Sequence, residues 1–221
     1  MSDPRLAQAV LFDLDGTLAD SAPDLVAALA ALCNEIGHAA PDPQVVSRVV
    51  SAGGRAILRS GLPGFDESRI EELLPRYLDL YAQRGNAATA LYAGIEPVLA
   101  GLEARGIAWG VVTNKVGWLA APMLDHLGLG TRCAALVAGD TLARRKPDPD
   151  PVLHACALLK VDPARTLFVG DDLRDIEAGR AAGTATVAAA WGYLNGGDPH
   201  AWGADQVAAS VPVLHAWLLP D

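Results

Sequence analysis

Short apolar runs alternate with longer segments of helical periodicity through most of this chain, and this alternation constrains the fold more than any other feature. The apolar runs predict buried strands over residues 9–12, 107–112, 134–137, 166–169 and 186–190. The segments between and after them predict helices over residues 94–105, 118–127, 151–160, 173–182 and 213–219. Such alternation is typical of parallel strands joined by right-handed crossovers. We therefore expect an α/β fold with a doubly wound, Rossmann-like parallel sheet.

Residues 20–89 interrupt this alternation. The sequence Ser-Ala-Pro at residues 21–23 is a typical helix start, and Pro75 would kink or break a later helix. Helical patterns follow at residues 45–50, 56–58 and 70–81. No run in this interval is typical of a strand. We therefore expect an all-helical domain over residues 20–89, inserted directly after the first strand, and an α/β core formed by residues 1–19 and 90–221.

The charge balance makes several partners improbable. The chain has 221 residues and a formal net charge of -9 at pH 7. An acidic surface repels nucleic acid and anionic lipid, so we expect neither as a partner. It also repels a phosphorylated substrate, so any phosphate site must be locally positive.

Cysteine usage and the apolar runs bear on the compartment. Cys33, Cys133 and Cys156 are widely spaced and form no CxxC motif, which is typical of reduced thiols. The first apolar run is too short for a signal peptide, and no stretch approaches the ~18 apolar residues of a membrane span. We expect a cytoplasmic protein, either a monomer or a dimer.

Two aspartates, Asp13 and Asp15, follow the first predicted strand. Ionised carboxylates at the end of a buried strand lose hydration and repel one another unless a cation or hydrogen bonds offset the cost. Asp-Gly is a common turn signal, and Gly16 allows a sharp turn here, but a turn needs only one carboxylate. The pair therefore predicts a metal-assisted site.

Polar residues follow the other predicted strands as well. The carboxyl ends of parallel strands meet at one edge of the sheet, where ligands bind. The residues delivered to that edge are Asp13 and Asp15, then Thr113, Asn114 and Lys115, then Lys146, and finally Asp171, Asp172 and Asp175. Oxygen ligands without histidine or thiolate favour Mg²⁺ over zinc.

These groups suit the transfer of a phosphoryl group. Asp13 can attack phosphorus to form an acyl phosphate, and Asp15 can act as general acid and then base. Thr113 and Lys146 can bind phosphate oxygens, and Asp171 would complete the metal site. Alternatively, Thr113 caps the helix after its strand, and Lys146 is a solvated charge in a basic run.

The chain resembles the haloacid dehalogenase superfamily over its whole length. The motifs are Asp-Leu-Asp-Gly-Thr at residues 13–17, Thr113, Lys146-Pro147, and Gly170-Asp171-Asp172 with Asp175. The resemblance implies that Asp13 is the nucleophile, that the main-chain carbonyl of Asp15 and the carboxylate of Asp171 ligate Mg²⁺, and that the helical insert is a cap. Asp175 would ligate through water or hold Lys146. Asp172 departs from the serine often found there, and the carboxylate at Asp15 argues against dehalogenation.

The substrate class follows from finer similarity. Residues 20–25 and 111–115 are similar to the phosphoglycolate phosphatase branch. Residues 50–56, 109–115, 170–177 and 200–205 are similar to bacterial N-acetylmuramic acid 6-phosphate phosphatases of peptidoglycan recycling. The resemblance implies a phosphatase for a small phosphorylated metabolite, with N-acetylmuramic acid 6-phosphate as the first choice and 2-phosphoglycolate as the alternative. A sugar-phosphate mutase, a signalling receiver domain and a catalytically silent binding protein stay open as further functions.

A loop in the insert, Gly53-Gly54-Arg55, has two interpretations. Arg55 either binds a substrate carboxylate through a bidentate pair or is a solvated arginine in an ordinary helix–helix turn. Both proposed substrates carry a carboxylate, so Arg55 does not discriminate between them.

Overall fold

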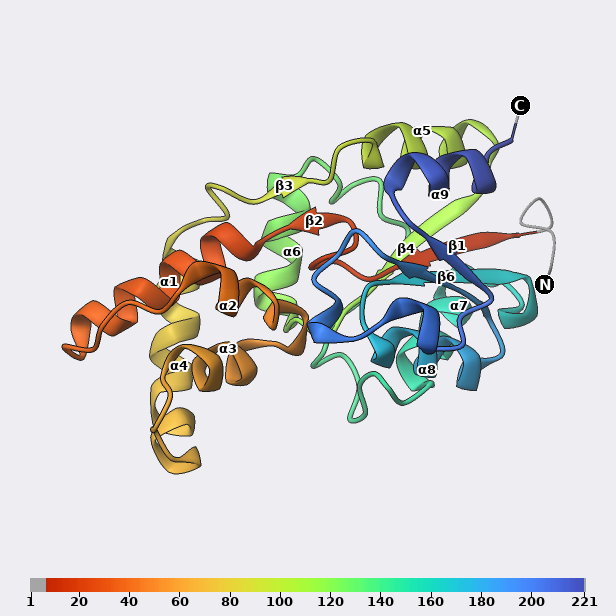
Figure 1. Cartoon of the computed structure of the whole chain (residues 1–221). Coiled ribbons are helices and arrows are strands. Elements are labelled where there is room, and N and C mark those ends of the chain that lie inside the picture. Colours follow the sequence, from red (N-terminus) through yellow and green to blue (C-terminus); the bar gives the residue numbers. More distant parts are fainter. Residues whose placement is uncertain (1–6, 221) are drawn as a thin grey trace.

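A six-stranded parallel sheet lies at the centre of the structure, which is a computed structural model describing residues 7–220 (Figure 1). Its strands are, in sheet order, β5 (Leu136–Val137), β4 (Ala108–Val112), β1 (Ala9–Phe12), β6 (Thr166–Gly170), β7 (Ala185–Ala189) and β8 (Gln206–Ala208). The predicted doubly wound α/β fold is confirmed. The short edge strand β8 was absent from the prediction, because three residues beginning with glutamine form no distinct apolar run.

Helices cover both faces of this sheet. One face packs against α5 (Ile95–Ala104), α6 (Gly117–His126) and α9 (Val211–Leu218), and the other against α7 (Asp150–Leu159) and α8 (Leu173–Ala182). In Figure 1, α5 and α9 lie above the sheet and α7 and α8 lie below it. Val10 and Phe12 pack on the face covered by α5, α6 and α9, and Leu11 packs on the face covered by α7 and α8. All three are fully buried. Burial on both faces explains why β1 reads as a continuous apolar run.

The sheet register brings distant residues to one edge. Phe12 pairs with Val111 on β4 and with Val169 on β6. The backbone N–H of Asp13 donates to the Val169 carbonyl over 2.9 Å. The residues that follow the three central strands therefore lie level with one another at the carboxyl edge.

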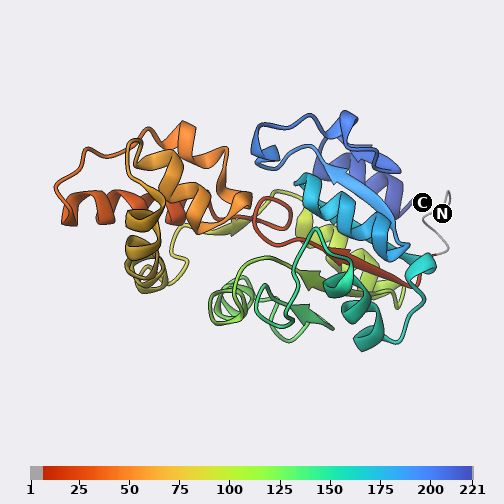
Figure 2. The ribbon, with the colours of Figure 1, turned by 90° about the horizontal axis from the view of Figure 1, so that it is seen from below.

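The other α-helices of the described residues 7–220 form a separate group beside this edge (Figure 2). They are α1 (Ala22–Glu35), α2 (Pro43–Ser47), α3 (Gly54–Gly61) and α4 (Glu67–Gln83). A small antiparallel sheet of β2 (Ala19–Asp20) and β3 (Ala90–Leu91) pairs the two chain segments that lead into and out of this group. We propose residues 20–89 as a domain of its own, called the cap below, with residues 1–19 and 90–221 as the core.

Two details of the cap differ from expectation. The helix α4 runs through Pro75 without a break, because Leu73 and Tyr77 on either side are buried and their packing holds the helix together. The helix expected over residues 45–50 ends at Ser47, and a separate 3₁₀ turn spans Val50–Ala52. Within residues 7–220, no helix has the length and apolar character needed to cross a membrane.

Candidate active site

Lys146 is the centre of a buried ion-pair network at the carboxyl edge. Its Nζ lies 2.9 Å from Asp13 Oδ1 and 2.7 Å from Asp175 Oδ1, and it donates to the Val112 carbonyl over 2.7 Å. Lys146 is only 3% exposed, so its interpretation as a solvated charge is wrong. Burial alone would lower the pKa of Lys146, but Asp13 and Asp175 outweigh it and raise that pKa. Lys146 thus stays a cation beside Asp13.

Asp171 is fully buried next to this network. Its Oδ1 accepts from Thr17 Oγ1 over 2.9 Å, and its Oδ2 accepts from Ser51 Oγ over 2.8 Å and from the Tyr193 N–H over 3.0 Å. Burial, followed by repulsion from Asp13, raises the pKa of Asp171 to about 7. The carboxylate is held in one orientation, and no cationic side chain within residues 7–220 forms an ion pair with it.

Gly16 allows the loop after β1 to approach Asp171. Its φ is +86°, and a Cβ at this position would lie 2.2 Å from Asp171 Oδ2. A side chain here would both strain the backbone and displace the carboxylate. The motif glycine is therefore required by close packing as well as by the turn.

Three carboxylates form a group that could hold a cation. Asp13, Asp171 and Asp175 each offer an oxygen, and these oxygens lie within 4.8 Å of one another. Burial raises the pKa of Asp175 well above its ordinary value, although Lys146 partly offsets the shift. Three buried acids against one ammonium leave the group short of positive charge, and an all-oxygen donor set suits Mg²⁺. The structure therefore fits the expected metal.

The carboxylate of Asp15 has its partners outside this group. Its carboxylate pairs with Lys115 Nζ at 3.1 Å and accepts from Ser21 Oγ over 2.5 Å. Lys115 Nζ also lies 4.5 Å from the centre of the Tyr81 ring in the cap. The structure groups the carboxylates of Asp13, Asp171 and Asp175. The prediction for Asp15 concerned its main-chain carbonyl, so the position of its carboxylate does not bear on that prediction.

Thr113 and Asn114 follow β4 at the same edge. Thr113 Oγ1 accepts from the Lys115 N–H over 3.1 Å, and its own hydroxyl hydrogen is left to donate. The N-cap of α6 is Val116, so the interpretation of Thr113 as the cap of that helix is wrong. Asn114 Nδ2 donates to the Lys146 carbonyl over 3.0 Å. Asn114 Oδ1 is buried and has no hydrogen-bond partner among the residues that the structure describes. These two residues therefore offer a ligand the Thr113 hydroxyl as a donor and Asn114 Oδ1 as an unpaired acceptor.

Asp172 does not join the carboxylate group. It caps the N-terminus of α8 and binds the guanidinium of Arg174 through both carboxylate oxygens, at 2.7 and 2.9 Å. Burial alone would raise the pKa of Asp172, but hydrogen bonds and charge from Arg174 outweigh it and lower that pKa. Asp172 is thus an ionised partner for Arg174.

A cavity of about 450 Å³ lies between the cap and these residues. Its core side includes Asp13, Asp15, Thr113, Asn114, Lys115 and Lys146. Its cap side includes Leu25, Val50, Ser51, Arg55, Ile57, Arg59, Leu74, Tyr77 and Leu78. The volume lies within the usual range for small-molecule sites.

The arginines of this cavity differ in their partners. Arg55 Nε and Nη2 donate to Glu71 at 2.5 and 2.9 Å, so its guanidinium is already paired within the cap. Arg59 is paired with Glu67 in the same way. Arg145 also lines the cavity, is exposed, and has no carboxylate partner within residues 7–220.

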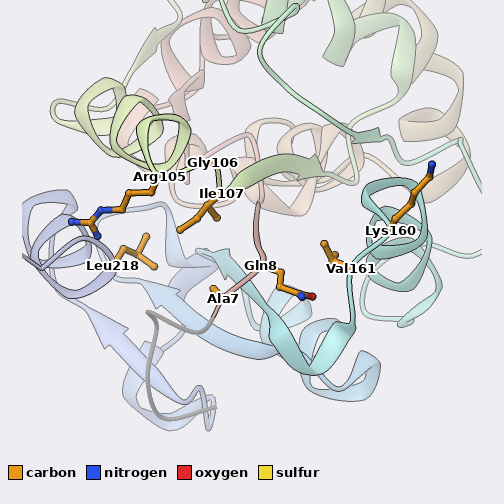
Figure 3. Close-up of a pocket in the computed structure, with 8 residues that line it drawn as sticks. All are labelled: Ala7, Gln8, Arg105, Gly106, Ile107, Lys160, Val161 and Leu218. Carbon is orange, nitrogen blue, oxygen red and sulfur yellow. The ribbon is translucent and has the colours of Figure 1, made fainter.

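A second cavity, of about 530 Å³, lies at the opposite end of the sheet (Figure 3). Ala7 and Gln8 precede β1 and Ile107 precedes β4, so this cavity adjoins the amino edge. Figure 3 shows the side chains of Arg105 and Lys160 on opposite sides of it, both directed away from its centre. It contains none of the carboxylates described above.

A comparison with known proteins decides the family. Residues 10–189 match the model of the haloacid dehalogenase-like hydrolases. The chain belongs to this family. It is 45% identical over 202 residues to an N-acetylmuramic acid 6-phosphate phosphatase of Pseudomonas aeruginosa, covering 90% of this chain and 89% of that protein. It is 44% identical over 220 residues to a phosphoglycolate phosphatase of Xanthomonas campestris pv. campestris, covering 98% and 100%.

A solved structure agrees in fold. The crystal structure of a predicted phosphoglycolate phosphatase from Haemophilus somnus superimposes with a TM-score of 0.85 at 24% identity, covering 95% of this chain and 96% of that one. Together with the curated relatives, the family match identifies this haloacid dehalogenase-like hydrolase as a phosphatase. The predicted family and enzyme class are confirmed.

The contacts of several residues at this candidate site could not be predicted from the sequence. Thr17 and Ser51 lie within motifs that were recognised, but nothing in the sequence indicates that both donate to Asp171. The sequence likewise gives no indication that Ser21 donates to Asp15, Arg174 to Ser51 or Tyr193 to Asp171. Their contacts cross from one segment to another, so local patterns carry no signal for them.

Proposed function

We propose that this protein is a Mg²⁺-dependent phosphomonoester hydrolase that acts through an aspartyl-phosphate on Asp13. The observation that carries the proposal is the position of Asp13 Oδ1, 2.9 Å from the buried Lys146 ammonium and grouped with Asp171 and Asp175. A carboxylate nucleophile needs a neighbouring positive charge to meet a phosphate dianion. Lys146 is held in place for this task by Asp175 and the Val112 carbonyl.

The residues around Asp13 suggest the order of steps. A carboxylate oxygen of Asp13 attacks phosphorus while Lys146 and the Thr113 hydroxyl bind the phosphate oxygens, and Asp15 gives a proton to the leaving alcohol oxygen. Asp15 then takes a proton from water, whose oxygen attacks the acyl phosphate and releases inorganic phosphate and free Asp13. Mg²⁺ would be held by Asp13, Asp171 and the Asp15 main-chain carbonyl, with Asp175 in support, and would offset the charge between phosphate and carboxylates.

Our preferred substrate is N-acetylmuramic acid 6-phosphate, a substrate of peptidoglycan recycling. The unpaired Asn114 Oδ1 supports this choice, because a buried acceptor needs a donor. The sugar carries hydroxyl and amide donors, whereas fully ionised 2-phosphoglycolate carries none. A cavity of about 450 Å³ with an apolar cap wall also leaves room for a sugar ring.

The substrate carboxylate has two candidate partners. Arg55 is our proposed partner and lines the cavity, but it must then share its guanidinium with Glu71. Arg145 lines the same cavity without such a partner among the described residues, so it is the second candidate. Bidentate pairing with either would select a sugar acid over a neutral sugar.

The other expectations about this phosphatase are part of the same proposal. The partner is a small phosphorylated metabolite, not nucleic acid or a membrane, because the net charge of -9 repels polyanions. We propose a cytoplasmic enzyme, as a monomer or a dimer. A sugar-phosphate mutase would use the same Asp13 chemistry and return the phosphoryl group to a second hydroxyl.

A substrate panel tests the proposal. Phosphate release is measured with N-acetylmuramic acid 6-phosphate, 2-phosphoglycolate and hexose phosphates, with and without Mg²⁺, and ranked by kcat/KM. We expect Mg²⁺-dependent release with the sugar acid first. A preference for 2-phosphoglycolate would overturn the substrate choice, and isomerised phosphosugar with little free phosphate would indicate a mutase.

A further inference from the structure

A serine of the cap reaches the proposed metal site. Ser51 lies in the 3₁₀ turn at Val50–Ala52, and its Oγ donates to Asp171 Oδ2 over 2.8 Å. The same hydroxyl lies 3.5 Å from the main-chain carbonyl of Asp15. These are two of the oxygens that we assign to Mg²⁺. The cap thus supplies one of the three donors that orient Asp171.

An arginine of the core holds the same turn from its backbone. Arg174 Nη2, on α8, donates to the Ser51 carbonyl over 2.7 Å. In the part of the chain that the structure describes, the hydrogen bonds within this turn use the carbonyls of Val49 and Val50, so that of Ser51 is left for Arg174. One cap residue is therefore bound to the core through both its side chain and its main chain.

Asp172 fixes the direction of Arg174. It accepts from Arg174 Nε over 2.7 Å and from Nη2 over 2.9 Å, and it also caps α8, on which Arg174 stands. A guanidinium held as a fork by a carboxylate keeps further N–H donors in fixed directions. The Arg174 side chain is 28% exposed and that of Asp172 only 6% exposed, so water competes weakly for this pair.

We propose that Arg174 is a positioning residue, which Asp172 aims at the Ser51 carbonyl so that the Ser51 hydroxyl is held against Asp171. The pair gives the unusual Asp172 a function outside metal binding. It also links the core helix α8 to Asp171 through Ser51 of the cap. The proposal rests on the proposed function in one respect, the assignment of Asp171 to the metal site.

Hydrogen exchange tests the contact without substrate or metal. Arg174→Ala should raise amide exchange at residues 50–54 roughly tenfold or more, because a charge-assisted hydrogen bond is lost. Arg174→Lys should recover part of the protection, and Asp172→Asn, which still caps α8, should loosen the turn less than Arg174→Ala. Arg69→Ala, in an exposed ion pair of α4, should leave exchange at residues 50–54 unchanged.

Unchanged exchange at residues 50–54 in Arg174→Ala would overturn the proposal. If amide exchange instead rises throughout the core, Arg174→Ala has lost overall stability. Exchange at residues 50–54 in Asp172→Asn then decides whether the pair holds the turn. Protection at residues 50–54 equal to that of the wild type in Asp172→Asn would also overturn it. Because no substrate is present, a wrong choice of substrate leaves this result intact.

A double-mutant cycle tests whether Arg174 acts through Ser51. Ser51→Ala removes the hydroxyl but keeps the carbonyl that Arg174 binds. We expect each single variant to lower kcat/KM roughly tenfold, and Ser51→Ala to have little further effect in the Arg174→Ala background. Additive losses would mean that Arg174 acts on the reaction independently of Ser51, and would overturn the positioning role.

Discussion

The core side and the cap side of the candidate active-site cavity hold their charged residues in different ways. On the core side, Asp13, Lys146 and Asp175 are nearly fully buried and are charged partners of one another. On the cap side, apolar residues alternate with arginines such as Arg55 and Arg59, whose partners are exposed glutamates. Buried pairs are costly to break and exposed pairs are not.

We infer that this difference separates the proposed chemistry from the choice of substrate. The core side depends on the register of the sheet, so a change there disturbs folding and reaction together. The cap side lies on a separate group of helices (Figure 2), and Arg55 and Arg59 pair only with glutamates of that group, so these two residues can vary without disturbing the carboxylates. Relatives of similar identity that are named for different substrates fit this division.

The largest expected effect is the loss of Asp13, the proposed nucleophile. Asp13→Asn keeps the shape of the side chain but removes the attacking carboxylate, so phosphate release should fall about 10⁴-fold or more. The measurement is steady-state release of inorganic phosphate, with Arg69→Ala as the matched control on the cap. Activity within tenfold of the wild type would exclude Asp13 as the nucleophile.

The next effect concerns stability on the core side. Lys146→Met leaves Asp13 and Asp175 without their cation, and we expect the free energy of unfolding to fall by about 3–5 kcal/mol. Arg59→Met on the cap side should cost about 1 kcal/mol or less, because its ion pair is exposed. Urea unfolding measures both. Equal losses would contradict the contrast between the two sides.

A smaller effect comes from Asp24, a buried charge of the cap. Asp24 is fully buried and accepts from Arg84 Nε, the Ala88 N–H and Thr89 Oγ1 at 3.1, 2.8 and 2.9 Å. Burial alone would raise the pKa of Asp24, but these hydrogen bonds outweigh it and lower the pKa below 3.8. Asp24→Asn should therefore cost about 1–3 kcal/mol at neutral pH.

The pH dependence of that cost has a defined sign. A carboxyl whose pKa is lower in the folded state stabilises the fold above its unfolded pKa of 3.8 and loses this contribution as pH falls through the folded value. The stability difference between wild type and Asp24→Asn should be constant near neutral pH and narrow below about pH 4. A difference that widens on acidification would contradict the assignment.

The smallest effect tests the carboxylate partner. Arg55→Ala and Arg145→Ala should each leave the hydrolysis of a neutral hexose phosphate nearly unchanged, and the variant that lacks the true partner should raise KM for the sugar acid roughly tenfold. The ratio of kcat/KM values for the two substrates is the measurement. If neither variant changes this ratio, both arginines are excluded.

Much of the core could be predicted because its signals are local. Helix α8 occupies the predicted residues 173–182, and strand β1 the predicted residues 9–12. The structure groups Asp13, Asp171 and Asp175, as expected for residues that follow parallel strands. The three-residue strand β8 was not predicted, because edge pairing decides it. Of the two outcomes expected at Pro75, a kink or a break, the structure excludes the break, which side-chain packing decides.

The sequence by itself determined the order of elements and the residues that each strand delivers to the carboxyl edge. Hydrophobic periodicity and strand ends depend on residues that are close together in the chain, so both can be recognised locally. Only the tertiary structure decided that Ser51 donates to Asp171, that Arg174 binds the turn of Ser51, and that Asp15 turns toward Lys115. The physical reason is separation along the chain: Ser51 and Asp171 are 120 residues apart, and contacts across that distance exist only once the cap packs against the core.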